Sequence, residues 1–307
     1  MSPEFPKGQR PPLLLTGAGG MLGSMLQART PAIYDLHPCT HADLDITDAD
    51  QVEALVLRLR PQVIVNCAAF ARVDACEASR ELALLVNGEG PGILARAAHK
   101  VGAVLVHFST DYVFDGCYRH PYVEEDATAP LSVYGLSKLR GEQAIQESGL
   151  ERYFIIRTSW LYGPDGPNFV ETIIRLAQER EELRIVDDQI GCPTYTRDLV
   201  LAAFRLLDVP RHSDLDHHSS PYGTFHFAGE GQCSWFEFAE VIVTLLRHHG
   251  QDLAVKRILP ISTADYPLPA ARPAWSVLST AKYQRVTGAA IPHWRQSLKD
   301  YFEARFS

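Results

Sequence analysis

The sequence predicts an α/β fold in which a doubly wound parallel sheet carries a smaller α/β lobe. Over the first half of the chain, short apolar runs alternate with stretches of helical periodicity, which is typical of a parallel sheet covered by helices. The runs at 63–69 and 103–108 are continuously apolar, as strands buried on both faces are. Beyond Gly163 this repetition stops, which predicts a second and smaller unit.

Composition excludes several classes of partner. The chain has 307 residues, a net charge of -8 and 46% hydrophobic residues, so it is a globular protein ill suited to bind nucleic acid. Its six cysteines show neither Cys-x-x-Cys pairs nor metal-type spacing, which indicates reduced thiols. The first twelve residues lack the apolar segment of a signal peptide, and no run approaches a membrane span. We therefore expect a cytoplasmic protein without a membrane partner.

The first element is a strand at 13–15, followed by a glycine turn and a helix. Gly17 permits the tight turn, Gly20 lets backbone N–H groups approach a pyrophosphate, and Gly23 allows close packing of helix on strand. The spacing is Gly-x-x-Gly-x-x-Gly, which differs from the Gly-x-Gly-x-x-Gly of simple dehydrogenases. The strand–turn–helix context nevertheless predicts a dinucleotide site.

A second strand is expected at 32–35, ending in Asp35. An acid there binds the adenosine ribose hydroxyls and favours NADH. In the alternative interpretation Asp35 belongs to a turn before His37. Separately, His37 and Arg10 lie nearby in the sequence and can tolerate the 2′-phosphate of NADPH, so both cofactors stay open. Thr47 or Asp48 then caps a helix at 49–59.

The next two strands end in residues suited to a ligand. Ala68 and Ala69, after the run that begins at Val63, are small enough for a cofactor to lie against the backbone. Ser109 and Thr110 follow the run at 103–108. Because ligands of open α/β sheets bind beyond the carboxyl ends of the strands, these hydroxyls are expected near a substrate oxygen. The alternative is that they only cap or turn the chain.

Tyr134 and Lys138 are four residues apart on a helix expected from about Ser132 to Ser148, so they share one face. A phenol titrates near pH ~10, and a neighbouring cation favours the phenolate. Lowering the pKa by about 3 units takes roughly 4 kcal/mol and brings the tyrosine into the range of effective general acid–base catalysis. The alternative is a surface aromatic beside a solvated lysine.

The second half of the chain predicts the smaller lobe. After a strand at 153–157 come a helix at 168–180, a strand at 183–186, a helix at 197–207 and a strand at 224–228. We assign 12–163 to a Rossmann-like dinucleotide-binding domain, to which 183–207 return. Residues 164–182 and 208–307 form the substrate-binding lobe.

Five sequence blocks occur in a characteristic order: Ser109–Gly116, Tyr134 with Lys138, Arg157–Trp160, Asp187–Thr194 and Ala271–Pro273. On these blocks the chain resembles the extended short-chain dehydrogenase/reductase family, and within it the dTDP-4-dehydrorhamnose reductases, over 13–294. The resemblance implies reduction of the C4 ketone of a dTDP-linked 4-keto-6-deoxy sugar, dTDP-4-dehydro-6-deoxy-L-mannose, to dTDP-L-rhamnose. It implies NADPH or NADH as cofactor and a monomer or homodimer.

The resemblance also implies a role for individual residues. Tyr134 donates a proton to the substrate oxygen, Lys138 holds the nicotinamide ribose and supports the acidity of the tyrosine, and Thr110 tunes the proton transfer. The residues implied to contact the cofactor or the sugar are Gly20, Met21 and Leu22 (pyrophosphate), Asp35 (ribose), Asp45 and Ile46 (adenine), Ala69, Phe70, Ala71 and Phe108 (the remainder of the cofactor), and Thr110, Asp111 and Trp160 (sugar).

Related functions remain as alternatives. A sugar-nucleotide dehydratase needs Asp-Glu after the strand-end threonine, whereas Tyr112 follows Asp111 here. An epimerase, another 4-ketoreductase, or a non-catalytic NADP-binding subunit like the β subunit of methionine adenosyltransferase stays open. Some family members hold magnesium through a glutamate where this chain has Arg197, so we expect no metal.

Overall fold

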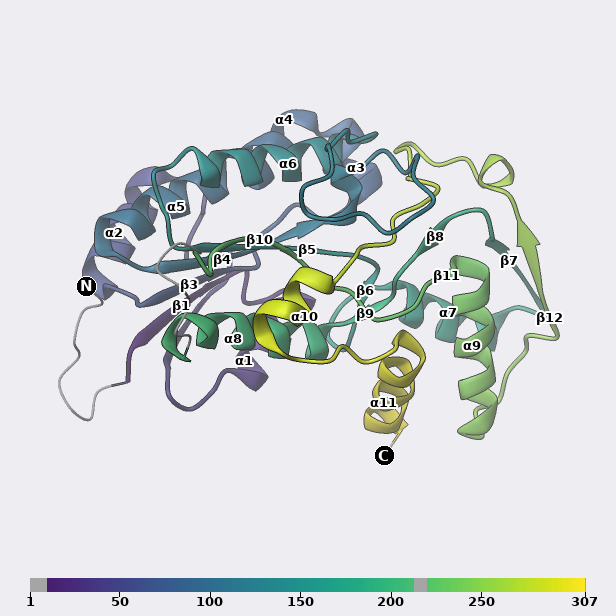
Figure 1. Ribbon diagram of the computed structural model, residues 1–307. Helices are drawn as coiled ribbons and strands as arrows, with labels where there is room; N and C mark the ends of the chain where they lie inside the picture. The colour runs from purple at the N-terminus through teal and green to yellow at the C-terminus, as the bar shows by residue number, and fades with distance from the viewer. Residues whose placement is uncertain (1–9, 213–219, 307) are drawn as a thin grey trace.

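The computed structural model describes residues 10–212 and 220–306, which form a helix-covered sheet with a lobe at one end (Figure 1). The strands are β1 (Pro12–Thr16), β2 (Asp35–Cys39), β3 (Val63–Asn66), β4 (Val104–Thr110), β5 (Tyr153–Thr158), β6 (Leu161–Tyr162), β7 (Glu182–Val186), β8 (Ile190–Gly191), β9 (Thr194–Tyr195), β10 (Gly223–His226), β11 (Cys233–Ser234) and β12 (Arg257–Ile261). The helices are α1 (Met21–Arg29), α2 (Ala49–Leu59), α3 (Val73–Ala78), α4 (Arg80–Ala83), the π-helical η1 (Leu84–Glu89), α5 (Gly90–Val101), the 3₁₀ turn η2 (Asp111–Val113), α6 (Val133–Gln146), α7 (Phe169–Glu179), α8 (Thr196–His212), α9 (Trp235–His248), the 3₁₀ turn η3 (Thr263–Asp265), α10 (Ala281–Thr287) and α11 (Trp294–Phe306).

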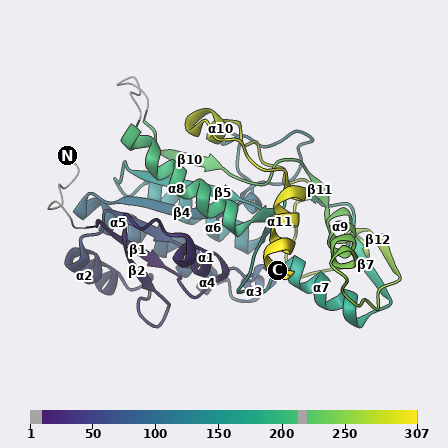
Figure 2. The ribbon, with the colours of Figure 1, turned by 90° about the horizontal axis from the view of Figure 1, so that it is seen from below.

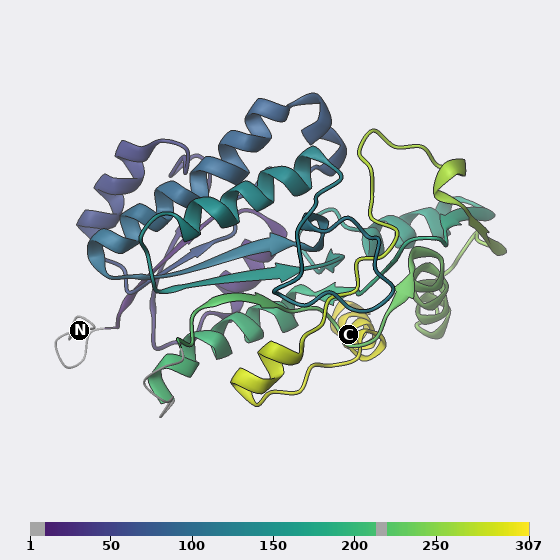
Figure 3. The same ribbon diagram turned by 45° about the horizontal axis from the view of Figure 1, so that its top comes forward.

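The main sheet has six strands in the order β10-β5-β4-β3-β1-β2, all paired in parallel. Because the chain passes from β1 to one edge and then returns through β3 toward the other, the sheet is doubly wound and its direction reverses between β1 and β3. Helices α2, α5 and α6 cover one face, and α1 and α8 cover the other (Figures 1 and 3). The predicted fold class is confirmed.

Local signals account for several elements. The Asp48 carboxylate accepts hydrogen bonds from the N–H groups of Asp50 and Gln51 and caps α2, as predicted. Ser132 caps α6 by accepting from the N–H of Gly135. Every residue of β3 and β4 is buried, which agrees with the continuous apolar runs that predicted them.

The predicted position of the second strand is wrong. β2 begins at Asp35, and Asp35 pairs with Pro12, the first residue of β1. The apolar run before it belongs to a turn in which Tyr34 is buried against Phe204. The true strand contains Pro38, which an edge strand tolerates because one side of its backbone makes no ladder.

The lobe is built from short pieces. Strands β7 and β12 pair in parallel, and α7 and α9 pack beside them. The expected domain division differs in two places: β7 stays in the lobe and does not return to the main sheet, whereas β10 lies in the main sheet beside β5. The four residues of β10 are too short a signal to show which sheet they join. In the described part of the chain no helix has the length and apolar character to cross a bilayer.

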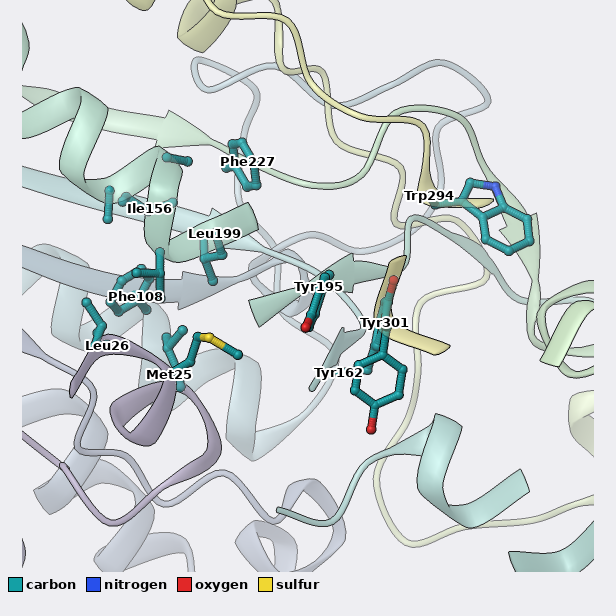
Figure 4. Close-up of a cluster of buried hydrophobic side chains, with 14 of the residues drawn as sticks. Met25, Leu26, Phe108, Ile156, Tyr162, Tyr195, Leu199, Phe227, Trp294 and Tyr301 are labelled. Carbon is teal, nitrogen blue, oxygen red and sulfur yellow. The ribbon is translucent and has the colours of Figure 1, made fainter. Parts of the chain in front are cut away.

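One apolar core joins the sheet to the lobe. It runs from Met25 and Phe108 at the sheet to Trp294 at the lobe (Figure 4). Between them Tyr162 and Tyr195 stack at 5.6 Å, and Tyr301 meets Tyr162 edge-on at 5.6 Å. Figure 2 shows α11, which carries Tyr301, between the two parts of the molecule. The orientation of the lobe is therefore set by buried aromatic packing.

We predict that Gly135→Ala lowers the free energy of unfolding by about 1–3 kcal/mol, the usual cost of overpacking. A Cβ at this position would lie 2.1 Å from the backbone oxygen of Tyr112, so α6 could not keep its place. Urea denaturation measures the difference. The matched control is Gln146→Ala at the exposed end of the same helix, and equal stability of the two variants would contradict the predicted clash.

Candidate active site

A cavity of ≈ 450 Å³ opens beyond the carboxyl ends of the central strands, next to the point where the sheet reverses direction. Its walls come from the glycine turn, the ends of β3, β4 and β5, the start of α6 and one residue of α9. The lining residues used below are Gly20, Met21, Leu22, Gly23, Asn66, Ala68, Ala69, Ala71, Phe108, Thr110, Asp111, Tyr112, Tyr134, Lys138, Trp160 and Trp235. Segments far apart in the sequence thus meet at one site.

The glycine turn packs directly on the chain after β3. Gly17 has a φ of +69°, and a Cβ there would lie 2.4 Å from the backbone nitrogen of Ala68. A Cβ at Gly23 would lie 2.2 Å from the oxygen of Gly17. No side chain caps the N-terminus of α1 after Gly20, so its first N–H groups are available to an anion. The turn fits a pyrophosphate.

Lys138 is almost completely buried beneath the cavity. Its Nζ donates a hydrogen bond to the carbonyl oxygen of Phe108 at 2.6 Å. Burial lowers the pKa of Lys138 to about 8, although the negative charge of Glu142 and the thiol of Cys67 act in the opposite direction. At neutral pH the amine is therefore still mostly protonated, but it can release a proton near working pH.

Tyr134 behaves differently from the sequence prediction. Burial and the nearby Asp111 carboxylate raise the pKa of its phenol, while a hydrogen bond with Thr110 acts in the opposite direction. The expectation that the Lys138 cation lowers this pKa is not met in this structure, where burial and Asp111 raise it. The phenol stays protonated at neutral pH, which is the state that a proton donor needs.

Thr110 and Asp111 form a buried pair at the end of β4. The Thr110 hydroxyl donates to Asp111 Oδ1 at 3.0 Å and accepts from the N–H of Tyr112. Burial raises the pKa of Asp111 to about 6, so this carboxyl group titrates closer to neutrality than an ordinary aspartate. The ring of Tyr112 meets that of Tyr134 edge-on at 5.8 Å.

A buried ion pair joins α6 to β5 of the sheet. Arg157 of β5 donates to both oxygens of Glu142, and the shortest contact is 2.7 Å. The hydroxyl of Ser109 donates to Glu142 Oε1 at 2.5 Å. Ser109 therefore serves to hold α6 on the sheet, whereas Thr110 is left as the strand-end hydroxyl beside Tyr134.

Trp160 and Trp235 form a stacked pair at the mouth of the cavity, with ring centroids 3.4 Å apart and planes 6° apart. The backbone of Trp160 has a φ of 46°, which is a strained conformation for a bulky residue and is often found at functional sites. The indole N–H of Trp235 donates to Gln189, whose amide donates to Thr263. The pair is thus tied to the lobe.

A second cavity of ≈ 770 Å³ lies in the lobe and shares Tyr112 and Trp235 with the first. Apolar residues of α7, β7 and the 266–271 segment line most of it. Arg180, Arg184 and Arg272 line it together with the carboxylates Glu182 and Asp265, so guanidinium groups that bind anions lie beside acidic groups. Arg272 is held by the Asp74 carboxylate through two contacts of 2.6 Å.

Most of the predicted site residues line the first cavity, but five do not. Gly17 lies outside the cavity lining. Phe70 packs against the buried cluster of Cys76, Ala83 and Val133, and its backbone is held by Asn87. Ile46 is buried below Gly90, and Asp45 bonds to Thr47, so their adenine contacts stay predictions. The fifth residue is Asp35.

The predicted ribose contact of Asp35 is wrong. Asp35 is the first residue of β2, and four residues of extended chain, roughly 13 Å, separate it from the end next to the glycine turn. Its carboxylate instead contacts exposed His37 at 3.0 Å. The position beside the turn belongs to Cys39, whose oxygen accepts from Ala18 N–H, and to Thr40. The argument from Asp35 for NADH therefore fails.

Sequence reasoning missed four residues of the site. Asn66 is the buried polar residue that ends the apolar strand β3, and this polar end was the available signal. His107 is a buried polar residue in the middle of β4. Asn87 lies in the π-helical turn η1 and donates to Ser137 of α6. Trp235 carried no signal, because only the fold brings α9 to Trp160.

The expectation of no metal stays a prediction. Among residues 10–212 and 220–306, no three His, Cys, Asp or Glu side chains are placed to hold an ion. Arg197, where family members place a glutamate, contacts Asp198 and Asp300.

Comparison with known proteins identifies relatives over the whole described chain. The model of the RmlD substrate binding domain family matches residues 11–306. The dTDP-4-dehydrorhamnose reductase of Burkholderia thailandensis is 40% identical, over 93% of this chain and 96% of that protein. The dTDP-4-keto-6-deoxy-D-glucose reductase of Streptomyces niveus is 39% identical, over 94% and 96%. A dTDP-4-dehydrorhamnose reductase from Bacillus anthracis, solved in complex with NADP, is 41% identical, with a TM-score of 0.86 over 96% of this chain and 100% of that one. The resemblance inferred from the sequence blocks is confirmed.

We predict that Asp35→Ala leaves the dissociation constants of NADH and NADPH unchanged, because Asp35 lies at the amino end of β2, away from the glycine turn. Thr40→Asp is the matched change directly after the carboxyl end of β2, where a carboxylate would repel a 2′-phosphate. We expect it to weaken NADPH relative to NADH by at least about tenfold, or 1.4 kcal/mol. Fluorescence titration with both cofactors measures this. A loss of binding in Asp35→Ala would restore the original assignment.

Proposed function

We propose a reaction from one premise: the chain belongs to the family of the RmlD substrate binding domain. It is an oxidoreductase that uses NADPH or NADH. We propose that its substrate is dTDP-4-dehydro-6-deoxy-L-mannose, which it reduces at C4 to dTDP-L-rhamnose. The observation that carries the proposal is the meeting of two cavities, one lined by a glycine turn and the other by arginines, beside Tyr134 and Lys138.

The first cavity suits the cofactor. The N–H groups that follow Gly20, at Met21 and Leu22, hold the pyrophosphate, and Ala68, Ala69 and Phe108 border the space that leads to Tyr134. When bound, the reduced nicotinamide supplies the hydride for the C4 ketone. The chain itself contributes the positions of the reacting groups and the electrostatic environment around them.

The proton comes from Tyr134. Its pKa is raised in the buried site, so the phenol carries its proton until negative charge develops on the C4 oxygen. Thr110, hydrogen-bonded to Tyr134, helps to direct that proton. The Lys138 cation then stabilises the phenolate that remains, and its hydrogen bond to the Phe108 carbonyl fixes its position.

The second cavity suits the nucleoside diphosphate. Its apolar walls, including Phe169 and Leu183, accept the flat thymine base, and Arg184 with Arg272 supplies positive charge to the diphosphate. The sugar then lies where the cavities meet, against the exposed part of Trp160. Trp235 fixes Trp160 from one side, so the sugar ring meets a rigid aromatic surface.

A direct assay tests the proposal. Each reduced cofactor is mixed with dTDP-4-dehydro-6-deoxy-L-mannose or with its D-glucose-configured counterpart, and the loss of reduced-nicotinamide absorbance is followed. We expect net cofactor oxidation with the L-mannose compound and dTDP-L-rhamnose as the product. A preference for the D-glucose compound would assign a different 4-ketoreductase. An epimerase would convert the sugar without net oxidation, and a binding subunit would bind cofactor without turnover.

We predict that Tyr134→Phe lowers kcat by at least about 100-fold, the usual contribution of a general acid, while cofactor affinity changes little. The substitution removes only the hydroxyl and keeps the edge-on contact of the ring with Tyr112. Steady-state kinetics and cofactor titration measure the two effects. Tyr118→Phe, at an exposed tyrosine outside both cavities, is the control. Unchanged turnover in Tyr134→Phe would remove this residue from the mechanism.

A further inference from the structure

A chain of polar side chains crosses the sheet beneath the first cavity. It joins Thr16 of β1, Asn66 of β3, His107 of β4 and Lys138 of α6, each of which is at most 3% exposed. The Thr16 hydroxyl donates to Asn66 Oδ1 at 2.7 Å, Asn66 Nδ2 lies 3.0 Å from His107 Nδ1, and His107 Nε2 lies 3.4 Å from Lys138 Nζ.

The orientation of the Asn66 amide is fixed by the backbone. The N–H of Ala68 can only donate, and it donates to Asn66 Oδ1 at 3.0 Å. The reversed amide would place an NH₂ group against this N–H, so two donors would face each other without an acceptor. The amide NH₂ must therefore point at His107 Nδ1.

The orientation of this amide determines which ring nitrogen of His107 carries the proton. Burial, together with the charge of Lys138, holds the pKa of His107 well below its ordinary value, so the ring is neutral. A neutral imidazole has one N–H and one acceptor nitrogen, and Nδ1 must be the acceptor because it faces the Asn66 NH₂ group. The proton is therefore on Nε2, which faces Lys138 Nζ.

An N–H directed at Nζ favours an amine over an ammonium. The ammonium form offers only donors, so one of its N–H groups would oppose the Nε2–H of His107. The neutral amine donates to the Phe108 carbonyl and accepts from His107 with its lone pair. We propose that Asn66 and His107 are positioning residues that direct an imidazole N–H at Lys138 and so make Lys138 a proton-releasing group toward Tyr134.

The proton step balances within the site and rests on the proposed function. After Tyr134 has given its proton to the substrate oxygen, a water in the cavity that both residues line relays a proton from Lys138. An N–H bond of the ammonium breaks and its proton passes to the water, and the water gives up a proton that forms the O–H bond of Tyr134 again. The Lys138 lone pair then accepts from His107 Nε2–H. Water returns a proton to the amine before the next turnover.

Burial already lowers the pKa of Lys138, and the other side chains around it do not add to this preference. Glu142, one turn along α6, favours the charged amine, but its oxygens are engaged by Arg157 and by Ser109. The thiol of Cys67, after β3, also favours the charged form. Tyr134 lies one turn earlier on the same helix. His107 is therefore the neighbouring side chain that opposes the ammonium by hydrogen-bond geometry.

Nuclear magnetic resonance tests the proposal without substrate, so failure of the proposed function is separable from failure of this one. In protein with ¹⁵N-labelled histidine, the His107 signals are assigned by their loss in His107→Gln. We expect the neutral Nε2–H tautomer between about pH 6 and pH 10. With ¹³C-labelled lysine, assigned by Lys138→Met, we expect Lys138 to titrate near about 8. A Nδ1–H tautomer or a cationic ring would overturn the proposal.

Asn66→Asp reverses the hydrogen bonds. A carboxylate accepts from Ala68 N–H and also from His107 Nδ1–H, so His107 Nε2 becomes an acceptor for the ammonium. We expect the pKa of Lys138 to rise by at least about one unit, and the alkaline limb of kcat/KM to move upward with it. A purely structural role would lower kcat or stability without moving that limb. An unmoved lysine titration would overturn the proposal.

His107→Gln supplies a second test if Asn66→Asp does not fold. A glutamine amide can keep the same order, with its oxygen accepting from Asn66 and its NH₂ facing Lys138. We expect it to retain the low lysine titration, within about half a unit of the wild type. His248→Gln, the same change at an exposed position of α9, is the control for lost histidine. A lysine titration that returns to its ordinary value in His107→Gln would require the imidazole itself and would overturn the hydrogen-bond argument.

Discussion

The attachment of α6 to the sheet is the constraint on which the site depends. Glu142 and Arg157 form an ion pair whose side chains are 1% and 6% exposed, and Ser109 completes the coordination of the carboxylate. Breaking such a pair by removing one partner leaves a buried charge without compensation, which costs far more than an intact surface pair contributes. Because Glu142 is two helical turns from Tyr134 and one from Lys138, this pair fixes the helix rotation that presents both residues to the cavity.

Burial shifts the pKa values of Tyr134 and Lys138 in opposite directions. Desolvation disfavours the charged form of each group, so it raises the pKa of the Tyr134 phenol and lowers the pKa of the Lys138 amine. Sequence alone suggested a simple pair in which a cation makes a phenol acidic. In the folded site the pKa of the Tyr134 phenol is raised, whereas that of the Lys138 amine is lowered to about 8. In the mechanism proposed above, electrostatic complementarity to the developing charge decides when the proton is transferred.

There are physical reasons why some features of the structure could be predicted from the sequence and others could not. The sheet, the caps at Asp48 and Ser132, and the placement of Tyr134 with Lys138 on one helix follow from local periodicity and hydrogen-bonding preferences, so they could be predicted. Asp35 was misplaced because a polar edge strand containing Pro38 has no apolar signal of its own, and its register is set by β1. The tautomer of His107 and the contact between Trp160 and Trp235 depend on segments 41 and 75 residues apart, so no local pattern contains them.

The shared aromatic core of sheet and lobe has a consequence for motion. Tyr162 and Tyr195 stack with each other, Tyr301 packs edge-on against both, and Trp294 extends the same cluster toward α9. A hinge motion that moved the lobe away from the sheet would have to separate these rings and expose them to water. The shared core therefore opposes such a hinge motion and makes the sheet and the lobe a single cooperative unit.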